Sequence, residues 1–210
     1  MDGSRNEVTL NALETLDRIH EKVNLSLVVY MTNRERVSNG LPIDLMGDGT
    51  VPIILSGIEL VEADLRGVNF RGVVLDRALL NRSDMTGADM TYVSAEDADF
   101  VGVHLYEAKM DYAKFKGSSF RLADMRYASL IGSDMRRTDC TGVRLRSADL
   151  DHTDFSDADL SGAMISASGI VEAELVRARR RPTDKSIPGW RLNENGRLYN
   201  YLNEISDDTP

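Results

Sequence analysis

The chain has 210 residues, of which 42% are hydrophobic, and its formal net charge is -9. This size and hydrophobic content fit one folded domain with modest appendages and argue against an intrinsically disordered chain. The single cysteine excludes an intramolecular disulfide framework, and no apolar run reaches the ~18 residues that a membrane-spanning helix needs.

Residues 1–52 are expected to form an N-terminal cap segment. Apolar residues recur at spacings of three and four within Val8–Val23, which predicts an amphipathic helix, and Leu25–Met31 is predicted to be a strand. This segment is expected to cover the open end of the following domain, and the alternative is a partner-binding or oligomerising element. No signal peptide opens the chain, so a cytoplasmic location is expected.

A five-residue repeat governs residues 53–175. Every fifth residue over 55–175 is large and apolar except Ala95 and Cys140, and none of them is charged. A second uncharged series, mainly Ala, Val, Ser and Thr, lies two residues before each of these positions. A period of five fits neither an α-helix nor a strand, so the chain must turn every five residues.

Four quarter turns would make one coil of about twenty residues, with both uncharged series inside and the other positions outside. Phe100 is then expected to stack on Phe120, one coil later. Cys140 falls inside the coil and is interpreted as a small core residue. Glycines recur two residues after large positions, at the corners, where a positive φ is least costly for them.

Residues 176–210 are expected to form a C-terminal cap and tail. Glu172–Arg181 is predicted to continue the chain as a short helix that stops at Pro182. Asn195-Gly196 is a good turn signal between apolar residues, so a hairpin or an irregular cap is expected within Trp190–Tyr201.

Several repeats share an Ala-Asp pair before the large residue. They include Ala63-Asp64-Leu65, Ala88-Asp89-Met90, Ala98-Asp99-Phe100, Ala123-Asp124-Met125, Ala148-Asp149-Leu150 and Ala158-Asp159-Leu160. These residues resemble the A-D/N-L-x-x motif of the pentapeptide-repeat family. The resemblance implies an all-β fold, a right-handed quadrilateral parallel β-helix, here with short α/β terminal caps. It also implies a binding or scaffold protein, in a family that includes gyrase inhibitors and protectors resembling duplex DNA.

Acidic side chains dominate the repeat region, which has 21 Asp and Glu against 13 Lys and Arg. Coils of about twenty residues would stack acidic residues in columns and Tyr92 on Tyr112. The candidate partner-binding residues are Asp64, Asp84, Asp134, Asp154, Glu174, Asp139, Asp159, Tyr92 and Tyr112. The alternative is that the acidic columns only keep the rod in solution.

No nucleophile, base and orienting group stand at a suggestive spacing, so no enzymatic activity, metal site or cofactor is expected. The expected function is an acidic rod that presents a protein-interaction surface, with DNA gyrase or topoisomerase as the most concrete partner through DNA mimicry. Neither direct nucleic-acid contact nor membrane contact is expected, and a homodimer stays open. The alternative is an adaptor scaffold whose partner is selected by the N-terminal segment.

Overall fold

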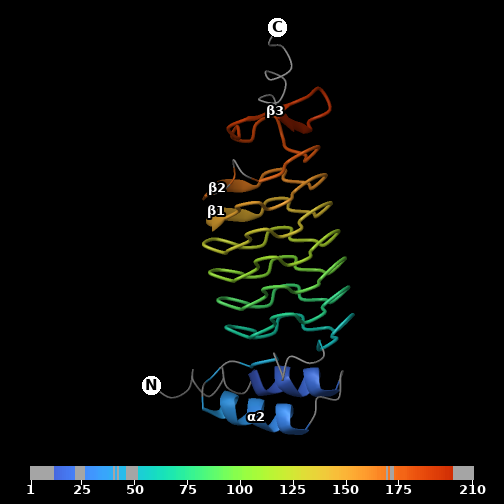
Figure 1. The fold of residues 1–210 in the computed structure, drawn as a ribbon, viewed down its shortest axis with the longest axis vertical. Helices are drawn as coiled ribbons and strands as arrows, with labels where there is room; N and C mark the ends of the chain where they lie inside the picture. The colour runs from blue at the N-terminus through green and yellow to red at the C-terminus, as the bar shows by residue number, and fades with distance from the viewer. Residues whose placement is uncertain are drawn as a thin grey trace.

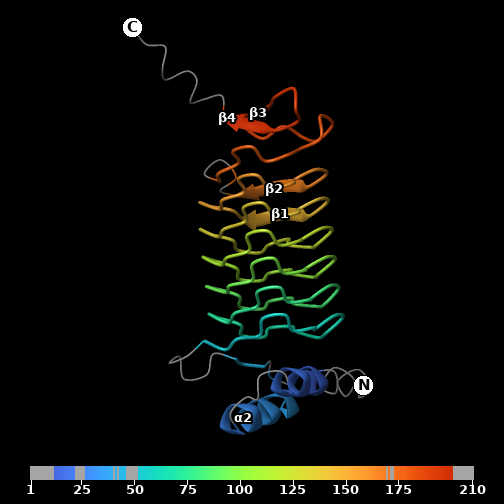
Figure 2. The ribbon, with the colours of Figure 1, turned by 90° about the vertical axis from the view of Figure 1, so that its right-hand side faces the viewer.

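The computed structural model describes residues 12–21, 27–39, 41, 43–45, 52–168, 170 and 173–200. Its body is a stack of coils with two helices at one end and a hairpin at the other (Figure 1). The view at right angles gives the same stacking (Figure 2). None of the helices in the described ranges is long and apolar enough to cross a membrane.

Parallel β-bridges join each coil to the next. One bridge pairs Asp134 with Asp154 and another pairs Asp154 with Glu174, so one coil takes 20 residues. At each bridge the chain bonds in both directions: the amide of Asp134 donates to the carbonyl of Ala113, and its carbonyl accepts from the amide of Phe115, both at 2.9 Å. The predicted coil length is therefore confirmed, and each regular coil has four five-residue steps.

The corners of the coils share one backbone conformation. A positive φ recurs at every fifth residue from 57 to 162, in glycines such as Gly117 and equally in Tyr92 and Tyr112. A hydrogen bond of 3.0 Å from the amide of Ser118 to the carbonyl of Phe115 closes the turn around Gly117. This pattern is that of a type II turn. The coil closes at these corners whether or not a glycine is present.

The interior is filled by the two uncharged series. Phe100 and Phe120 stack with ring centroids 4.7 Å apart, as predicted, and Phe115 meets both rings edge-on. Cys140 is fully buried, and burial raises the pKa of its thiol to about 12. The thiol is therefore neutral near pH 7 and packs as a core side chain.

Two named strands lie side by side near the C-terminal end of the stack. Strand β1 (Arg144–Asp149) pairs in parallel with β2 (Met164–Ser168), with an irregularity in the register after Arg146. The next bridge of this region, Asp154 with Glu174, returns to the 20-residue spacing, so the coils continue beyond it.

An antiparallel hairpin caps the last coil, as predicted around Asn195-Gly196. Its strands are β3 (Trp190–Leu192) and β4 (Leu198–Asn200). Leu198 donates its amide to the carbonyl of Ala178 at 2.8 Å, so the hairpin satisfies backbone groups at the end of the stack.

The predicted short helix over Glu172–Arg181 is wrong in its described part. Arg179 pairs with Asp159 one coil earlier, and coil pairing thus continues past the predicted domain boundary at residue 175. Ala173, Leu175 and Ala178 keep the small and large inward positions of the repeat, and this burial decides the conformation.

The N-terminal segment covers the opposite end of the stack. A helix over residues 12–21 and helix α2 (Leu27–Ser38) lie at this end, with α2 the farther of the two from the coils (Figures 1 and 2). Leu16 and Ile19 are fully buried and Val37 is 2% exposed. The helix predicted over Val8–Val23 is thus confirmed for its described residues.

The strand predicted over Leu25–Met31 is wrong in its described part, because α2 begins at Leu27. Strand-favouring Val and Tyr residues suggested an extended segment. Asn33 and Val37, which lie four residues apart on the same side of α2, are instead both buried. Tertiary burial of a helix face outweighs the local preference here.

Residues 43–45 add a partial rung beneath the first regular coil. Asp44 bridges Asn69, an offset of 25 residues where the other isolated parallel bridges of the described chain span 20. The side chain of Asn33 takes both hydrogen bonds on the free edge of this rung: its Nδ2 donates to the carbonyl of Asp44 at 2.8 Å, and its Oδ1 accepts from the amide at 2.6 Å. Asn33 therefore ends the β-pairing without leaving an open edge.

Candidate interaction surface

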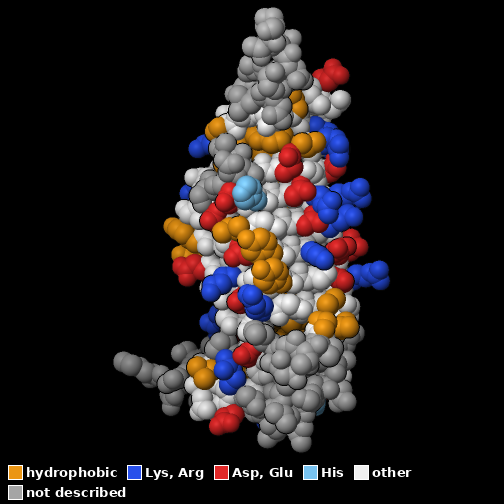
Figure 3. Space-filling view, in the orientation of Figure 1, with side chains coloured by type: hydrophobic (Ala, Val, Ile, Leu, Met, Phe, Trp, Pro, Cys, Tyr) orange, Lys and Arg blue, Asp and Glu red, His pale blue; other side chains and the backbone are white. Residues whose placement is uncertain are grey.

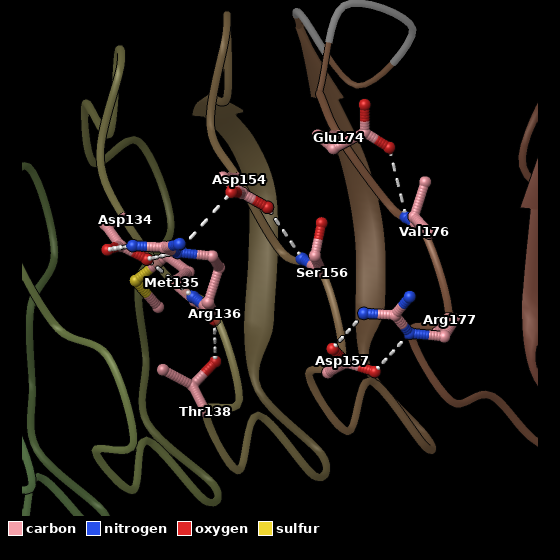
Figure 4. Close-up of polar contacts among 10 residues, drawn as sticks. All are labelled: Asp134, Met135, Arg136, Thr138, Asp154, Ser156, Asp157, Glu174, Val176 and Arg177. Atoms are coloured by element: carbon pink, nitrogen blue, oxygen red, sulfur yellow. Dashed lines mark hydrogen bonds and ion pairs between the residues drawn. The ribbon is translucent and has the colours of Figure 1, made fainter.

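One acidic column consists of Asp134, Asp154 and Glu174, on the same face of three successive coils (Figure 4). The two bridges that join these residues place their backbones about 4.8 Å apart along the stack, so the carboxylates are close neighbours on one face. Like charges at this spacing repel one another, and solvent screens part of the repulsion.

Each carboxylate of this column also holds the turn that follows it. Asp134 and Asp154 accept a hydrogen bond from the backbone amide two residues later, at 3.1 and 2.9 Å, and Glu174 accepts one from Val176 at 3.2 Å. Such side-chain bonds to the backbone stabilise turns. The acidic residues are thus part of the coil geometry as well as of its surface charge.

Arg136 connects the first two members of the column. Its Nε and Nη2 donate to the carboxylate of Asp134 at 2.8 and 2.5 Å, and its Nε lies 3.6 Å from Oδ2 of Asp154 (Figure 4). Burial acts to raise the pKa of Asp134, but the hydrogen bonds and charge of Arg136 hold that pKa below its ordinary value. The sequence offered the signal, an Arg two residues after an Asp, but its role as a clamp was not predicted.

A second acidic column, Asp139 and Asp159, occupies the adjoining face one five-residue step later. Both side chains accept the backbone amide two residues on, at 3.0 and 2.9 Å, and Arg179 lies 3.7 Å from Asp159. The corner between the two columns carries Arg137, Asp157 and Arg177, and Arg177 grips Asp157 with two hydrogen bonds of 2.8 and 2.7 Å. The two acidic columns are therefore separated by a ladder of alternating charge.

The predicted tyrosine pair borders the first of these faces. Tyr92 and Tyr112 stack at 5.4 Å between ring centroids and are each about half exposed, at 54% and 52%. The guanidinium of Arg71 lies 5.0 Å from the Tyr92 ring centroid, a cation–π arrangement. The space-filling view shows stacked hydrophobic side chains along the rod with acidic and basic side chains mixed beside them (Figure 3).

Asp64 and Asp84 lie apart from the other candidates. They stack on each other near the N-terminal end of the solenoid, on the face opposite that of Asp134, and several coils separate them from Asp139 and Asp159 along the rod. Arg66 clamps them, at 2.7 Å from Asp64 and 3.8 Å from Asp84. The candidate residues thus form one contiguous group of seven and one separate pair.

A similar clamp on Asp124 leads to a prediction about acid stability. Two hydrogen bonds of 2.7 Å from Arg126 lower the pKa of Asp124, against the opposing effect of burial. A carboxyl whose pKa is lowered by folding stabilises the native state above its unfolded pKa of about 3.9, and this stabilisation is lost as the pH falls through the folded pKa. We expect an Arg126→Gln variant to melt below the parent at pH 7, with a difference that shrinks towards pH 2.5.

Calorimetric melting curves of the two proteins between pH 2.5 and 7 measure this difference. Arg121→Gln, at an exposed corner with no acidic partner among the described ion pairs, is the control and should leave the profile unchanged. A melting difference for Arg126→Gln that is equal at both ends of the pH range would show that the Asp124 pair does not contribute in this way.

Comparison with known protein families supports the five-residue repeat found in this chain. The pentapeptide-repeat family, described as pentapeptide repeats in eight copies, matches residues 58–94, 83–121, 98–137 and 138–167, which together exceed half of the chain. No curated protein sequence matches the chain.

Several solved structures are similar to this one. HetL from the cyanobacterium Nostoc sp. strain PCC 7120, a pentapeptide-repeat protein involved in heterocyst differentiation regulation, is 20% identical with a TM-score of 0.32, covering 70% of this chain and 80% of HetL. Rfr23 from the cyanobacterium Cyanothece 51142 is 17% identical with a TM-score of 0.31, covering 72% and 95%. Full-length QnrB1, a plasmid-mediated fluoroquinolone resistance protein, is 16% identical with a TM-score of 0.28, covering 66% and 80%.

The family match spans an uninterrupted stretch from residue 58 to residue 167, the same stretch in which the 20-residue coils stack. The chain forms a β-helical solenoid and belongs to the pentapeptide-repeat family.

Proposed function

We propose that this chain is a non-enzymatic binding protein whose solenoid presents a protein-interaction surface that extends from its middle coils to its C-terminal end. The surface comprises the two acidic columns and the tyrosine pair that borders them. The observation that carries the proposal is their contiguity: Asp134, Asp154 and Glu174 share one face, and Asp139 and Asp159 share the next. Stiff coils hold these groups in fixed register, so little ordering is needed when a partner binds.

The partner that we propose is DNA gyrase. A rod with carboxylates on coils about 4.8 Å apart along its axis offers a basic groove an ordered series of negative charges. We propose, from the family resemblance, that the β-helix is right-handed and has a square cross-section. Such a helix would give the rod the stiffness that a DNA mimic requires. We propose a cytoplasmic location on the same ground, because gyrase acts on the bacterial chromosome there.

The arginine clamps limit this mimicry to part of the surface. Arg136 and Arg179 each lie within 4 Å of a column carboxylate, and Arg137 and Arg177 stand between the columns. A partner that recognises this surface must therefore match alternating charges as well as the acidic excess. Such a pattern suits a protein groove with both basic and acidic side chains better than it suits a uniformly basic one.

The adaptor alternative depends on the N-terminal segment, and the buried contacts of Leu16, Ile19 and Val37 favour a capping role for that segment instead. We accordingly propose residues 1–52 as a cap and the repeat region as the functional part.

A gyrase supercoiling assay tests the proposed partner. Titration of the purified protein, with and without a fluoroquinolone, is expected to change supercoiling, and the effect should weaken when the salt concentration is raised, because charge pairing at exposed surfaces is screened. No effect at high micromolar protein at either salt concentration would reject gyrase as the partner and leave the surface without its proposed target.

A further inference from the structure

A cavity of about 360 Å³ lies between the last coil and the C-terminal hairpin. This volume falls within the range of small-molecule sites in proteins, roughly 300–1,000 Å³. Arg180 lines the cavity together with the apolar side chains of Ile187, Trp190, Leu192 and Leu198. It lies at the end of the solenoid, next to the last members of the acidic columns, because Arg179, the neighbour of Arg180, pairs with Asp159.

Arg180 is a buried cation with few partners. Its side chain is 4% exposed, its Nη2 donates to the carbonyl of Lys185 at 3.2 Å, and its Nε lies 4.0 Å from Oδ2 of Asp184. Within the described part of the chain its Nη1 has no hydrogen-bond partner. A guanidinium has five N–H donors, and leaving them unmet in a buried site is costly.

Asp184 pairs only weakly with this guanidinium, because its Oδ2 already accepts two hydrogen bonds from backbone amides. The same oxygen accepts the amide of Gly162 at 3.0 Å and that of Arg181 at 2.8 Å. Burial lowers the pKa of Arg180, and the charge of Asp184 offsets only part of that effect. The charge of Arg180 in this cavity is thus neutralised only in part, by the single 4.0 Å contact with Asp184.

The surroundings of Arg180 define the kind of anion that fits. Arg181, Lys185 and Arg191 add positive charge at the cavity wall, whereas Trp190 and Leu198 are at most 7% exposed and supply apolar surface. A planar carboxylate pairs with a guanidinium through two parallel hydrogen bonds. A carboxylate joined to a short apolar group would satisfy both parts of the site.

We propose that this cavity binds such an apolar carboxylate, with Arg180 as the residue that recognises its charge and Trp190, Ile187 and Leu198 holding its apolar part. The carboxylate can belong to a free small acid or to the C-terminus of a peptide ending in an apolar residue, since both present the same group.

Trp190 makes the test direct, because it is the only tryptophan of the chain and lines the cavity. Tryptophan fluorescence of the full-length protein is followed during titration with hexanoate, with 1-hexanol and with inorganic phosphate. We expect saturable binding of hexanoate with a Kd on the order of 1–10 mM, the range for so small a ligand. An equal response to 1-hexanol would overturn the role of the charge, and an equal response to phosphate would overturn that of the apolar walls.

Variants at Arg180 test the recognition itself. Arg180→Gln is expected to weaken hexanoate binding at least about tenfold and to abolish the rise in Tm that hexanoate gives the parent. Arg180→Lys, which keeps the charge but loses the two-point geometry, should show an intermediate loss. Arg121→Gln, on the solenoid outside the cavity lining, is the matched control and should bind within about twofold of the parent. Unchanged binding in both Arg180 variants would overturn the proposal.

A peptide probe separates the two sources of the carboxylate. Acetyl-Ala-Leu is compared as the free acid and as the amide. Binding of the free acid at least about tenfold tighter than hexanoate would identify a peptide C-terminus as the ligand, and binding of hexanoate alone would identify a free small acid. Binding of the amide as tightly as the free acid would contradict a carboxylate site.

Discussion

Replacing Phe120 with alanine is expected to lower the free energy of unfolding by about 3–5 kcal/mol. Its ring is fully buried, stacks on Phe100 at 4.7 Å and meets Phe115 edge-on at 5.1 Å. Because consecutive coils share this core, the cavity left by the ring would weaken contacts on both neighbouring coils. Urea unfolding followed by circular dichroism measures the loss.

Tyr112→Ala is the matched control, since it removes a stacked ring of similar size from the surface. Tyr112 stacks on Tyr92 at 5.4 Å but is 52% exposed, so its removal should cost no more than about 1 kcal/mol. Equal losses in the two variants would mean that burial within the coil is not the main source of stability. Such a result would contradict the description of the interior as one continuous core.

Replacing Ile19 with aspartate is expected to destabilise the protein by more than about 3 kcal/mol, because the new carboxylate would be buried without a partner. Ile19 is fully buried in the helix over residues 12–21, and Arg18 of the same helix donates to the backbone carbonyl of Glu59 in the first coil. The measurement is the melting temperature, together with hydrogen exchange of the amides of residues 53–70.

Glu14→Ala serves as the control, because Glu14 belongs to the same helix but is exposed. It should leave both the melting temperature and the exchange of the first coil unchanged. A normal melting temperature and protected amides in Ile19→Asp would show that the N-terminal helix does not cap the solenoid. That result would favour the alternative in which the N-terminal segment selects a binding partner.

The body of the fold could be predicted from the sequence because the repeat leaves few alternatives. A large apolar residue every five positions, with a small one two before it, can be buried only if the chain turns at each repeat, and the stack of Phe100 on Phe120 follows. The same arithmetic predicted the vertical neighbours of the acidic columns and of Tyr92. These neighbours follow from the 20-residue spacing alone, without knowledge of individual side-chain contacts.

The ends of the chain were harder to predict because their conformation depends on what they cover. The residues at the start of α2 favour a strand by composition, whereas burial of Asn33 and Val37 against the coil gives a helix. The extra rung at Asp44 pairs with Asn69 across 25 residues, five more than a regular coil. The five-residue repeat does not predict this longer spacing. Tertiary contact decides both features.

The candidate surface could be predicted only in part, for a different reason. The repeat gives the column to which a carboxylate belongs but not the direction of a long neighbouring side chain. Arg136 folds back onto Asp134 and reaches Asp154, so two charges that looked free on the sequence are clamped. A pair such as Asp-x-Arg across a corner can be used as the signal for this clamp in other repeats.

The central claim is that the acidic columns of the C-terminal half bind the partner, and matched charge removal tests it most directly. Asp154→Asn with Asp159→Asn is compared with Asp64→Asn with Asp84→Asn, which lie near the N-terminal end of the solenoid on the face opposite that of Asp154. Asparagine keeps the side-chain oxygen that accepts the turn amide, at 2.9 Å for Asp154 and Asp159 and at 3.0 Å for Asp84, so the coil is preserved while the charge is lost.

Each double variant is titrated into the gyrase supercoiling assay at low salt, after its melting temperature has been found equal to that of the parent. We predict that the Asp154 and Asp159 pair shifts the half-effective concentration upward by about tenfold and that the Asp64 and Asp84 pair shifts it by less than about twofold. Equal shifts for the two pairs, or a larger shift for Asp64 and Asp84, would contradict the claim.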